Sequence, residues 1–364
     1  MAERKLGVLV HGAGWVSTQH IQAFANNPHA EVVAISSRRL SSCEKRADEA
    51  GLKGIGLYTD FEEALRHDGV HIVAVCTPQY LHCENTLAAA AAGKHIVIEK
   101  PIANSVDEMR QMRDAVRSAK VKTVVSFVLR WNPLFETVKA MIADDALGKV
   151  YYVETDYEHD IGGWWSGYED ARKKSTGVSA LVVSGCHAID AMRWFAGAGR
   201  YEAAKPVEVF AYSGGYRKGR RQYYDYNAKE FADGEPLEYD GLEVAMVKFD
   251  NGALGKVSVN FDCVMPYVFP IEIFGDKGSV RDNRVWSHKF PGQNDWVEIP
   301  AILPDSADVS QHPFQGEIDH FVDCILTDTE SHANLEDAIR THEVAFAALQ
   351  CYETRQPVKL PLIT

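Results

Sequence analysis

Five nearly continuous apolar runs within the first 127 residues constrain the fold more than any other feature of the sequence. They occupy residues 8–10, 31–35, 71–76, 95–98 and 123–127. A strand of a parallel sheet is apolar along its whole length when helices cover both faces of the sheet. Helical stretches lie between the runs, and one opens with the capping-box sequence Ser105-Val106-Asp107-Glu108. Strands that alternate with helices in units of about thirty residues predict a doubly wound parallel α/β sheet.

After about Phe127 the pattern changes to strand candidates that follow one another closely. Asp250-Asn251-Gly252 separates two of them, and Asn-Gly at such a place is typical of a β-hairpin. A helix is expected from about Pro313 and another near Asn334. A chain of 364 residues is long enough for two domains. We therefore predict a doubly wound domain over residues 1–126 and an α+β domain with a large, mainly antiparallel open sheet over residues 127–364.

Composition excludes several classes of protein. The net charge of −13, from 38 Lys and Arg against 51 Asp and Glu, argues against a nucleic-acid partner. No apolar run approaches the roughly 18 residues of a membrane helix, so no span is expected. Residues 1–5 lead directly into a strand candidate, which leaves no room for a signal peptide and predicts a cytoplasmic protein. The seven cysteines are scattered without a Cys-x-x-Cys pair, which predicts reduced thiols and no metal site.

The segment Gly12-Ala13-Gly14-Trp15-Val16-Ser17 follows the first strand candidate and opens the first helix. Glycines at this place let the backbone approach a pyrophosphate, and the amides at the helix N-terminus meet its charge. Ser17 stands where the fingerprint has its third glycine, so a tight turn without a ligand is the alternative. The position at the first strand–helix junction favours a dinucleotide.

The second strand candidate ends in Ser36-Ser37-Arg38-Arg39 and offers no carboxylate to the ribose hydroxyls of NAD. Ser37 and Arg38 could bind a 2′-phosphate, which favours NADP. An arginine can also lie over the adenine ring without any phosphate. NAD and NADP therefore both stay open, with a slight physical preference for NADP.

Two further segments follow the third and fourth strand candidates, where open α/β sheets bind their ligands. They are Thr77-Pro78-Gln79-Tyr80-Leu81-His82 and Glu99-Lys100-Pro101. A lysine at a buried strand end is costly unless it has a partner or a chemical role. The alternative is a surface lysine paired with Glu99.

In the second half of the chain, His187 and Asp190 are three residues apart and share a face if the segment is helical. A carboxylate one turn away can hold an imidazole in the orientation that proton transfer requires. The pair is therefore a candidate for acid–base catalysis, and the alternative is a buried structural histidine.

Taken together, these residues resemble the glucose-fructose oxidoreductase, inositol dehydrogenase and MocA (Gfo/Idh/MocA) family. The motifs are Gly12-x-Gly14 with His20, Thr77-Pro78 with His82, Gly93-Lys94-His95 before Glu99-Lys100-Pro101, Arg130-x-Asn132-Pro133, and Gly185-x-His187-x-x-Asp190. The closing segment from His312-Pro313-Phe314 to Val358-Lys359-Leu360-Pro361 is also similar. The resemblance covers nearly the whole chain. It implies an N-terminal Rossmann domain, a second domain whose open sheet often forms oligomers, and NAD(P)-dependent oxidation of sugars or polyols.

The resemblance also implies roles for single residues. Lys100 and His187 match the catalytic lysine and the acid–base histidine, and Asp190 matches the acidic position one turn later. Cofactor contacts are implied at Gly12, Gly14, Trp15, Val16, Ser37, Arg38, Thr77, Pro78, His82, Glu99, Lys100 and Arg130. Substrate contacts are implied at Lys100, His187 and Asp190. They are also expected at Trp164 and Trp165, whose aromatic faces could pack on a sugar ring or an aglycone, although the tryptophans could equally be core or interface residues. Many members hold an aspartate four residues before the histidine, where this chain has Val183, so Asp190 or Lys100 must take over part of the proton relay.

Residues 162–194 resemble family members that oxidise the C3 hydroxyl of a glycoside to a ketone. We expect His187 to take the hydroxyl proton while Lys100 stabilises the developing alkoxide or carbonyl. The alternatives are a redox-neutral glycosidase with a tightly bound cofactor, an inositol or polyol dehydrogenase, and a non-catalytic regulator that senses a dinucleotide. A homo-oligomer and a partner lyase that consumes the keto product are also expected.

Overall fold

The computed structural model describes residues 5–226, 228–301 and 313–363. His312, part of the closing segment of the family resemblance, lies outside the described residues. The chain forms two compact units, the first from Met1–Val128 and Pro313–Ala338 and the second from Leu129–His312 and Ile339–Thr364. The predicted boundary after residue 126 places residues 313–338 in the second domain, whereas the structure places them in the first unit. The amphipathic pattern after Pro313 indicates that this helix buries one face, but it does not indicate which of the two sheets the helix covers.

The first unit contains a six-stranded parallel sheet in the order β3-β2-β1-β4-β5-β6. Its strands are β1 (Leu6–His11), β2 (Ala30–Ser36), β3 (Gly56–Tyr58), β4 (Val70–Val75), β5 (His95–Ile98) and β6 (Thr123–Val125). The strand order reverses between β1 and β4, which is the switch point where doubly wound sheets bind ligands. The predicted doubly wound parallel sheet is confirmed.

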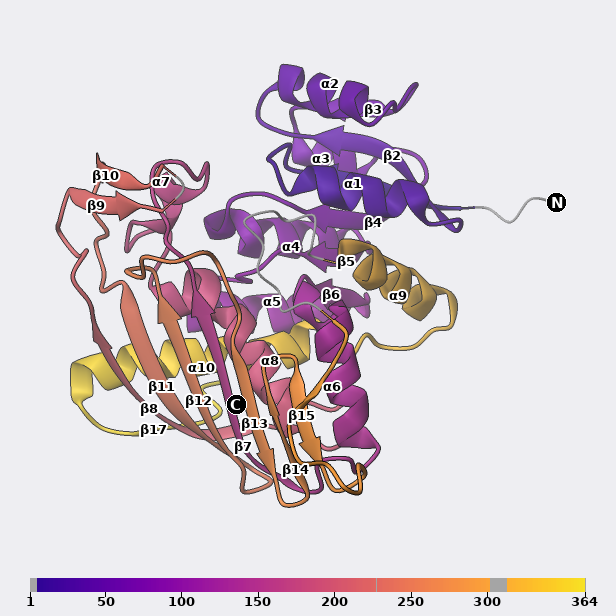
Figure 1. The fold of residues 1–364 in the computed structure, drawn as a ribbon. Helices are drawn as coiled ribbons and strands as arrows, with labels where there is room; N and C mark the ends of the chain where they lie inside the picture. The colour runs from indigo at the N-terminus through magenta and orange to yellow at the C-terminus, as the bar shows by residue number, and fades with distance from the viewer. Residues whose placement is uncertain (1–4, 227, 302–312, 364) are drawn as a thin grey trace. The chain divides into compact units, whose positions relative to one another are not determined.

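Helices lie around this sheet (Figure 1). They are α1 (Ser17–Asn26), α2 (Leu40–Glu49), α3 (Phe61–Leu65), α4 (His82–Ala91), α5 (Val106–Ala119) and α9 (Phe314–Leu326), with the short turn η1 (Gln79–Leu81). Helix α4 packs against α5, and α1 packs against α9, where the Nδ2 of Asn27 donates to Asp319 Oδ1 at 2.7 Å and joins the end of α1 to α9. At the start of α5 the backbone N–H of Glu108 donates to Ser105 Oγ at 3.2 Å, as the capping box predicts. Residues 313–338 thus add a covering helix to the Rossmann-type sheet.

The second unit contains a nine-stranded sheet in the order β16-β15-β14-β13-β7-β12-β11-β8-β17. Its strands are β7 (Val150–Glu158), β8 (Pro206–Gly214), β11 (Leu242–Phe249), β12 (Leu254–Asn260), β13 (Ile271–Gly275), β14 (Gly278–Arg281), β15 (Arg284–Ser287), β16 (Val297–Glu298) and β17 (Val358–Lys359). β7 and β12 are parallel, and the other neighbouring pairs are antiparallel. The predicted hairpin at Asn251-Gly252 joins β11 to β12. A separate hairpin pairs β9 (Gln222–Asp225) with β10 (Glu230–Asp233).

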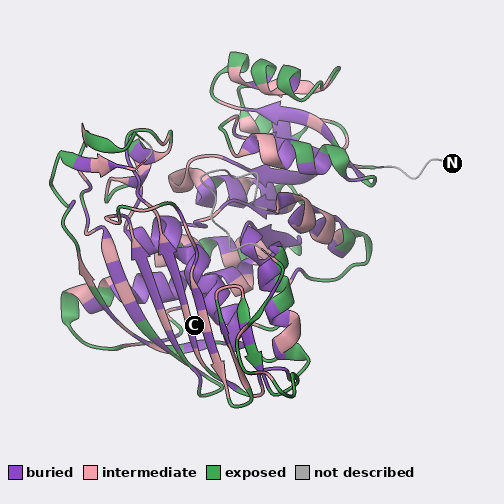
Figure 2. Cartoon of the chain, viewed as in Figure 1, coloured by how far each residue is buried: buried purple, intermediate pink, exposed green. Residues whose placement is uncertain are grey.

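Among the helices of the second unit, those that begin at Leu181 and Cys186 contact β7 and β12 of the large sheet. The helices of this unit are η2 (Val128–Trp131), α6 (Pro133–Ala143), α7 (Tyr168–Ala171), the π-helical turn η3 (Leu181–Gly185), α8 (Cys186–Ala196) and α10 (Leu335–Thr354), whose residues from Ile339 on belong here. Thr155 Oγ1 of β7 donates to the carbonyl of Ala188 in α8 at 2.7 Å. Along β11 and β8, side chains alternate between buried and more exposed (Figure 2). None of the helices in the described ranges is both long and apolar enough to cross a membrane.

Candidate active site

The turn after β1 has the geometry of a phosphate-binding loop. Gly12 has φ +104°, and a Cβ there would lie 2.4 Å from the carbonyl oxygen of Cys76, so only glycine fits. A Cβ on Gly14 would meet no atom within 4 Å, so this side of the turn is open to a ligand. Ser17 Oγ donates to the carbonyl of Gly14 at 2.6 Å and closes the turn where the fingerprint has its third glycine. The turn therefore presents open backbone at the start of α1.

Several residues that are predicted to contact the cofactor lie near this turn, and so does Arg46, which the sequence did not single out. Trp15 is 49% exposed and Arg38, just after β2, is also exposed. The backbone N–H of Ser37 donates to the carbonyl of Tyr58, the last residue of β3, at 3.1 Å. The backbone of Ser37 is thus bound to the neighbouring strand. Arg46 on α2 reaches back to the turn, where its Nε donates to Ala13 O at 3.2 Å. Its helical spacing alone gives no sign of this contact.

The segment after β4 is tied to the segment after β5 through His82. The ring is 1% exposed, with Nδ1 2.7 Å from Pro101 O and Nε2 2.8 Å from Thr77 O. Burial lowers the pKa of His82 despite these two carbonyl contacts. The hydroxyl of Thr77 donates to Asn85 Oδ1 at 2.9 Å. Both ring nitrogens of His82 thus contact the protein's own backbone, so its geometry fits holding the two loops together better than a cofactor contact.

The Glu99-Lys100 dipeptide is held by a buried carboxylate. Glu99 Oε1 lies 2.7 Å from His20 Nε2, and its Oε2 accepts the backbone N–H of Lys100 at 3.2 Å. Burial acts to raise the pKa of Glu99, but the hydrogen bond from His20 and the nearby charge of Lys100 lower it below its usual value. The carboxylate therefore anchors the backbone of Lys100, and the half-buried lysine is not the simple surface partner of Glu99.

Asp190 forms a buried ion pair with Arg130, a partner that its spacing does not predict. Its carboxylate is 2% exposed and accepts Nε and Nη2 of Arg130 at 2.7 and 2.6 Å, while Thr341 Oγ1 donates to Oδ1 at 3.1 Å. A buried arginine needs such a bidentate partner. This carboxylate is therefore held by Arg130 and Thr341, and the expectation that Asp190 also orients His187 stays a prediction. Arg130, expected at the cofactor, is enclosed in this ion pair.

His187 lies in the first turn of α8, 4% exposed, beside an aromatic cluster of β7 and the segment before β13. Its ring centroid lies 6.1 Å from that of Phe269, which contacts Tyr157 and Tyr267 edge-on. Burial raises the pKa of the Tyr157 hydroxyl, and this hydroxyl lies 2.9 Å from His159 Nδ1. The sequence did not single out these aromatic residues, although alternation along β7 places residue 157 on the side of the sheet that α8 covers.

The predicted tryptophans lie in the loop that follows β7. Trp164 is 41% exposed, and its ring centroid lies 5.6 Å from that of His159. Trp165 is half-buried and packs near Gly167. Trp164 therefore borders the cluster beside His187, whereas Trp165 contacts its own loop. Lys100 belongs to the first unit, and His187 belongs to the second.

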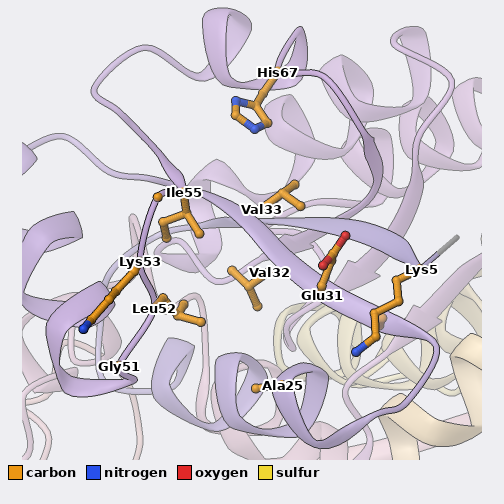
Figure 3. A pocket seen from close by; sticks show the side chains of 12 residues that line it. Lys5, Ala25, Glu31, Val32, Val33, Gly51, Leu52, Lys53, Ile55 and His67 are labelled. Atoms are coloured by element: carbon orange, nitrogen blue, oxygen red, sulfur yellow. The ribbon is translucent and has the colours of Figure 1, made fainter. Parts of the chain in front are cut away.

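A hollow of about 460 Å³ lies elsewhere in the first unit (Figure 3). Its lining includes Lys5, Glu31, Lys53 and His67, from residues before β1, at the start of β2 and around β3. These residues gather at the amino ends of β1 and β2, whereas the glycine turn follows the carboxyl end of β1. Doubly wound sheets bind nucleotides at their carboxyl ends, so this hollow is not the cofactor site.

An open glycine turn at the switch point of a doubly wound parallel sheet defines a nucleotide-binding Rossmann domain. Residues 6–127 match the family model described as oxidoreductase family, NAD-binding Rossmann fold, and residues 135–281 match the GFO/IDH/MocA C-terminal domain. The chain belongs to the Gfo/Idh/MocA family. It is an NAD(P)-dependent oxidoreductase whose first unit is the NAD-binding domain.

Several characterised proteins are similar over most of the chain. Levoglucosan dehydrogenase of Pseudarthrobacter phenanthrenivorans is 29% identical over 300 residues, covering 77% of this chain and 74% of its own. D-glucoside 3-dehydrogenase of Escherichia coli is 25% identical over 267 residues, 72% of each chain. The solved structure of a levoglucosan dehydrogenase in complex with NADH has a TM-score of 0.82 at 21% identity, covering 99% of this chain and 100% of that one. At this identity the structural likeness establishes the fold.

Proposed function

We propose that the protein oxidises a secondary hydroxyl of a sugar or glycoside, at C3, with NAD(P) as the hydride acceptor. The observation that carries this proposal is Lys100, held at the end of β5 by the buried Glu99, in a chain that also keeps His187 beside an aromatic wall. Aromatic faces pack against sugar rings and aromatic aglycones. The similarity to levoglucosan dehydrogenase and D-glucoside 3-dehydrogenase supports a carbohydrate substrate.

The chain's own residues supply the proton chemistry. His187 takes the hydroxyl proton, and the Lys100 ammonium donates a hydrogen bond to the oxygen as it becomes a carbonyl. Bound NAD(P) supplies a hydride acceptor, and the open turn at Gly14 with the amides of α1 would hold its phosphates. Because Val183 replaces the aspartate of many members and Asp190 is bound to Arg130, the proton stays with His187 until solvent takes it.

A panel of O- and C-glycosides and free sugars, incubated with NAD and with NADP, tests this proposal. We expect NAD(P)H absorbance to rise together with a product two mass units lighter than the substrate. A free aglycone without NAD(P)H would identify a redox-neutral glycosidase instead. Oxidation of inositols alone would identify a polyol dehydrogenase.

Arg38 is proposed to bind the 2′-phosphate of NADP. Replacing it with alanine removes a charge-assisted hydrogen bond, so KM for NADP is expected to rise about ten-fold while KM for NAD stays within about two-fold. Steady-state kinetics with both cofactors measure this, and the exposed Arg66 supplies the control variant Arg66→Ala. Equal changes with NAD and NADP would instead indicate that the guanidinium lies over the adenine ring.

We further propose that a second copy of the chain covers the outer face of the nine-stranded sheet. Tyr212, Met246 and Leu254 on β8, β11 and β12 are 58%, 43% and 42% exposed. Charges on the same face are already paired, as in the contacts of Lys256 with Asp156 at 2.9 Å. A broad face of apolar residues and paired charges suits a two-fold contact between identical copies.

Met246→Arg tests this assembly. An unpaired charge in the middle of the contact is expected to halve the molar mass measured by light scattering after gel filtration, because burying it costs several kcal/mol. Asp233→Arg on the exposed hairpin strand β10 is the matched control and leaves the mass unchanged. A wild-type mass retained by Met246→Arg would rule out this face.

A further inference from the structure

Glu243 lies on the inner side of β11 and contacts the segment that leads to His187. Its carboxylate is 2% exposed. Oε2 accepts the hydroxyl of Ser179 at 3.1 Å and the backbone N–H of Leu181 at 3.0 Å, and Oε1 accepts the N–H of Ala180 at 3.3 Å. One buried carboxylate therefore binds three consecutive residues, six to eight positions before His187.

The segment that Glu243 binds is irregular. Val178 has φ +69°, a left-handed conformation that is costly for a β-branched residue. The next residues form the π-helical turn η3 (Leu181–Gly185), which runs directly into α8. Amides in the first turn of a helix have no acceptor within the helix. The position of this turn thus depends strongly on an acceptor from outside, and Glu243 provides it.

The opposite end of α8 is fixed. The Lys139 amino group of α6, 0% exposed, donates to the carbonyl of Trp194, to that of Gly197 at 2.6 Å and to that of Glu202 at 2.9 Å. Burial lowers the pKa of this amine to about 7, so the favourable interaction of its positive charge with the helix dipole belongs to the acid side of neutrality. With this end held, and with Thr155 bound to the carbonyl of Ala188, loosening of η3 would act on the short stretch between η3 and Ala188, where His187 lies.

Apart from burial, the largest influences on the Glu243 carboxyl are hydroxyl groups and backbone N–H groups. Burial raises the pKa of Glu243 to about 7, although the hydrogen bonds from Leu181 and Ser179 act to lower it. Neutral hydroxyls surround the carboxyl, and it can therefore take up a proton near neutral pH. Three hydroxyl-bearing residues face Glu243: Ser179 before η3, Tyr239 before β11 and Tyr352 on α10, and the charge of Asp240 acts on the Tyr352 hydroxyl. On the neighbouring strands, Ser213 of β8 and Val259 of β12 stand opposite Glu243.

We propose that Glu243 is a positioning residue for His187. The Glu243 carboxylate holds η3 in place, and protonation of Glu243 releases that turn. A protonated carboxyl is a weaker acceptor and cannot bind all three donors equally well. The consequence for turnover rests on the proposed function: kcat falls on the acid side of neutrality while cofactor binding to the other unit is unchanged.

Hydrogen exchange of the free enzyme tests the positioning without any substrate. After correction for intrinsic exchange, amide protection in residues 180–187 is expected to be about five-fold greater at about pH 8 than at about pH 6 in the wild type. In Glu243→Gln the protection is low and does not change with pH. Glu298→Gln, on the exposed edge strand β16 of the same sheet, is the control and behaves as wild type. Because no turnover is measured, failure of the sugar-oxidation proposal leaves this result intact.

The pH dependence of the free energy of unfolding provides an independent test of the proposal. The folded-state pKa of about 7 exceeds the usual 4.5, so the folded state binds more protons between these values. This group's contribution to the free energy of unfolding is therefore complete below about pH 4.5 and is lost as pH rises towards 7, whereas protection of the η3 amides rises. Positioning is supported if, relative to Glu243→Gln, the wild type loses free energy of unfolding as pH rises while the protection of its η3 amides increases. Parallel changes, or wild-type protection that is independent of pH, would overturn it.

A second variant, with a shorter carboxylate, keeps the test valid if Glu243→Gln folds poorly. Glu243→Asp keeps the charge but shortens its reach, so protection of residues 180–187 is expected to fall while its dependence on pH remains. Circular dichroism checks that each variant is folded. If the aspartate variant loses the pH dependence as well, the carboxylate of residue 243 is not its source.

Discussion

Lys100→Met is expected to lower kcat for sugar oxidation about 100- to 1,000-fold. The ammonium is proposed to donate a hydrogen bond where negative charge develops on the substrate oxygen, and loss of one such donor typically costs this much. Methionine keeps the length of the side chain, and Glu99 can still accept the backbone N–H of residue 100. The affinity for NAD(P)H is therefore expected to change by less than about three-fold. Steady-state kinetics and a fluorescence titration of the cofactor measure the two quantities.

The control for this substitution is Lys45→Met, because Lys45 is an exposed lysine on α2 whose side chain is 68% accessible. It should leave both quantities at the wild-type level. A Lys100→Met enzyme that keeps more than about a tenth of wild-type kcat would remove the lysine from the chemistry. Loss of cofactor affinity alone would make Lys100 a binding residue.

The second large effect is expected at His187. His187→Asn removes the proposed base and should lower kcat about 100- to 10,000-fold, the range usual for the loss of a general base. Added imidazole is expected to restore part of the rate, because a small base can enter the space left by the ring. Measurements of kcat with and without imidazole test this. Any rescue should be absent from Lys100→Met.

His288→Asn is the matched control because His288 is exposed and lies in another part of the second unit. A His187→Asn enzyme with near-wild-type turnover would show that another group takes the proton. His159 would then be the first candidate, since its ring lies in the same aromatic cluster.

Local patterns explain why the first unit is predictable from sequence. Continuous apolar runs identify strands covered on both faces, and Gly12 is required by the close approach of Cys76. Ser105 likewise caps the helix by accepting the N–H of Glu108, as the capping-box sequence predicts, while the Glu108 carboxylate accepts the N–H of Asn104. In each case the information is carried by neighbours in the chain or by a steric rule.

Contacts between distant segments were not predictable in the same way. Helical spacing places His187 and Asp190 on one face, but the buried Arg130 provides a stronger partner for the carboxylate. Glu243 is an unremarkable charged residue in the sequence, and its contact with η3 depends on the register of β11 in the sheet. Sequence patterns show which face a residue occupies, and tertiary packing decides what it meets there.

Transfer of deuterium from a labelled substrate tests the central claim most directly. A glycoside accepted by the enzyme, deuterated only at C3, is incubated with NAD(P), and the reduced cofactor and sugar product are analysed by mass spectrometry. Oxidation at C3 predicts one deuterium in NAD(P)H, a 3-keto product without the label, and a slower chemical step than with unlabelled substrate. A reduced cofactor without deuterium, formed alongside a product that keeps its label at C3, would contradict it.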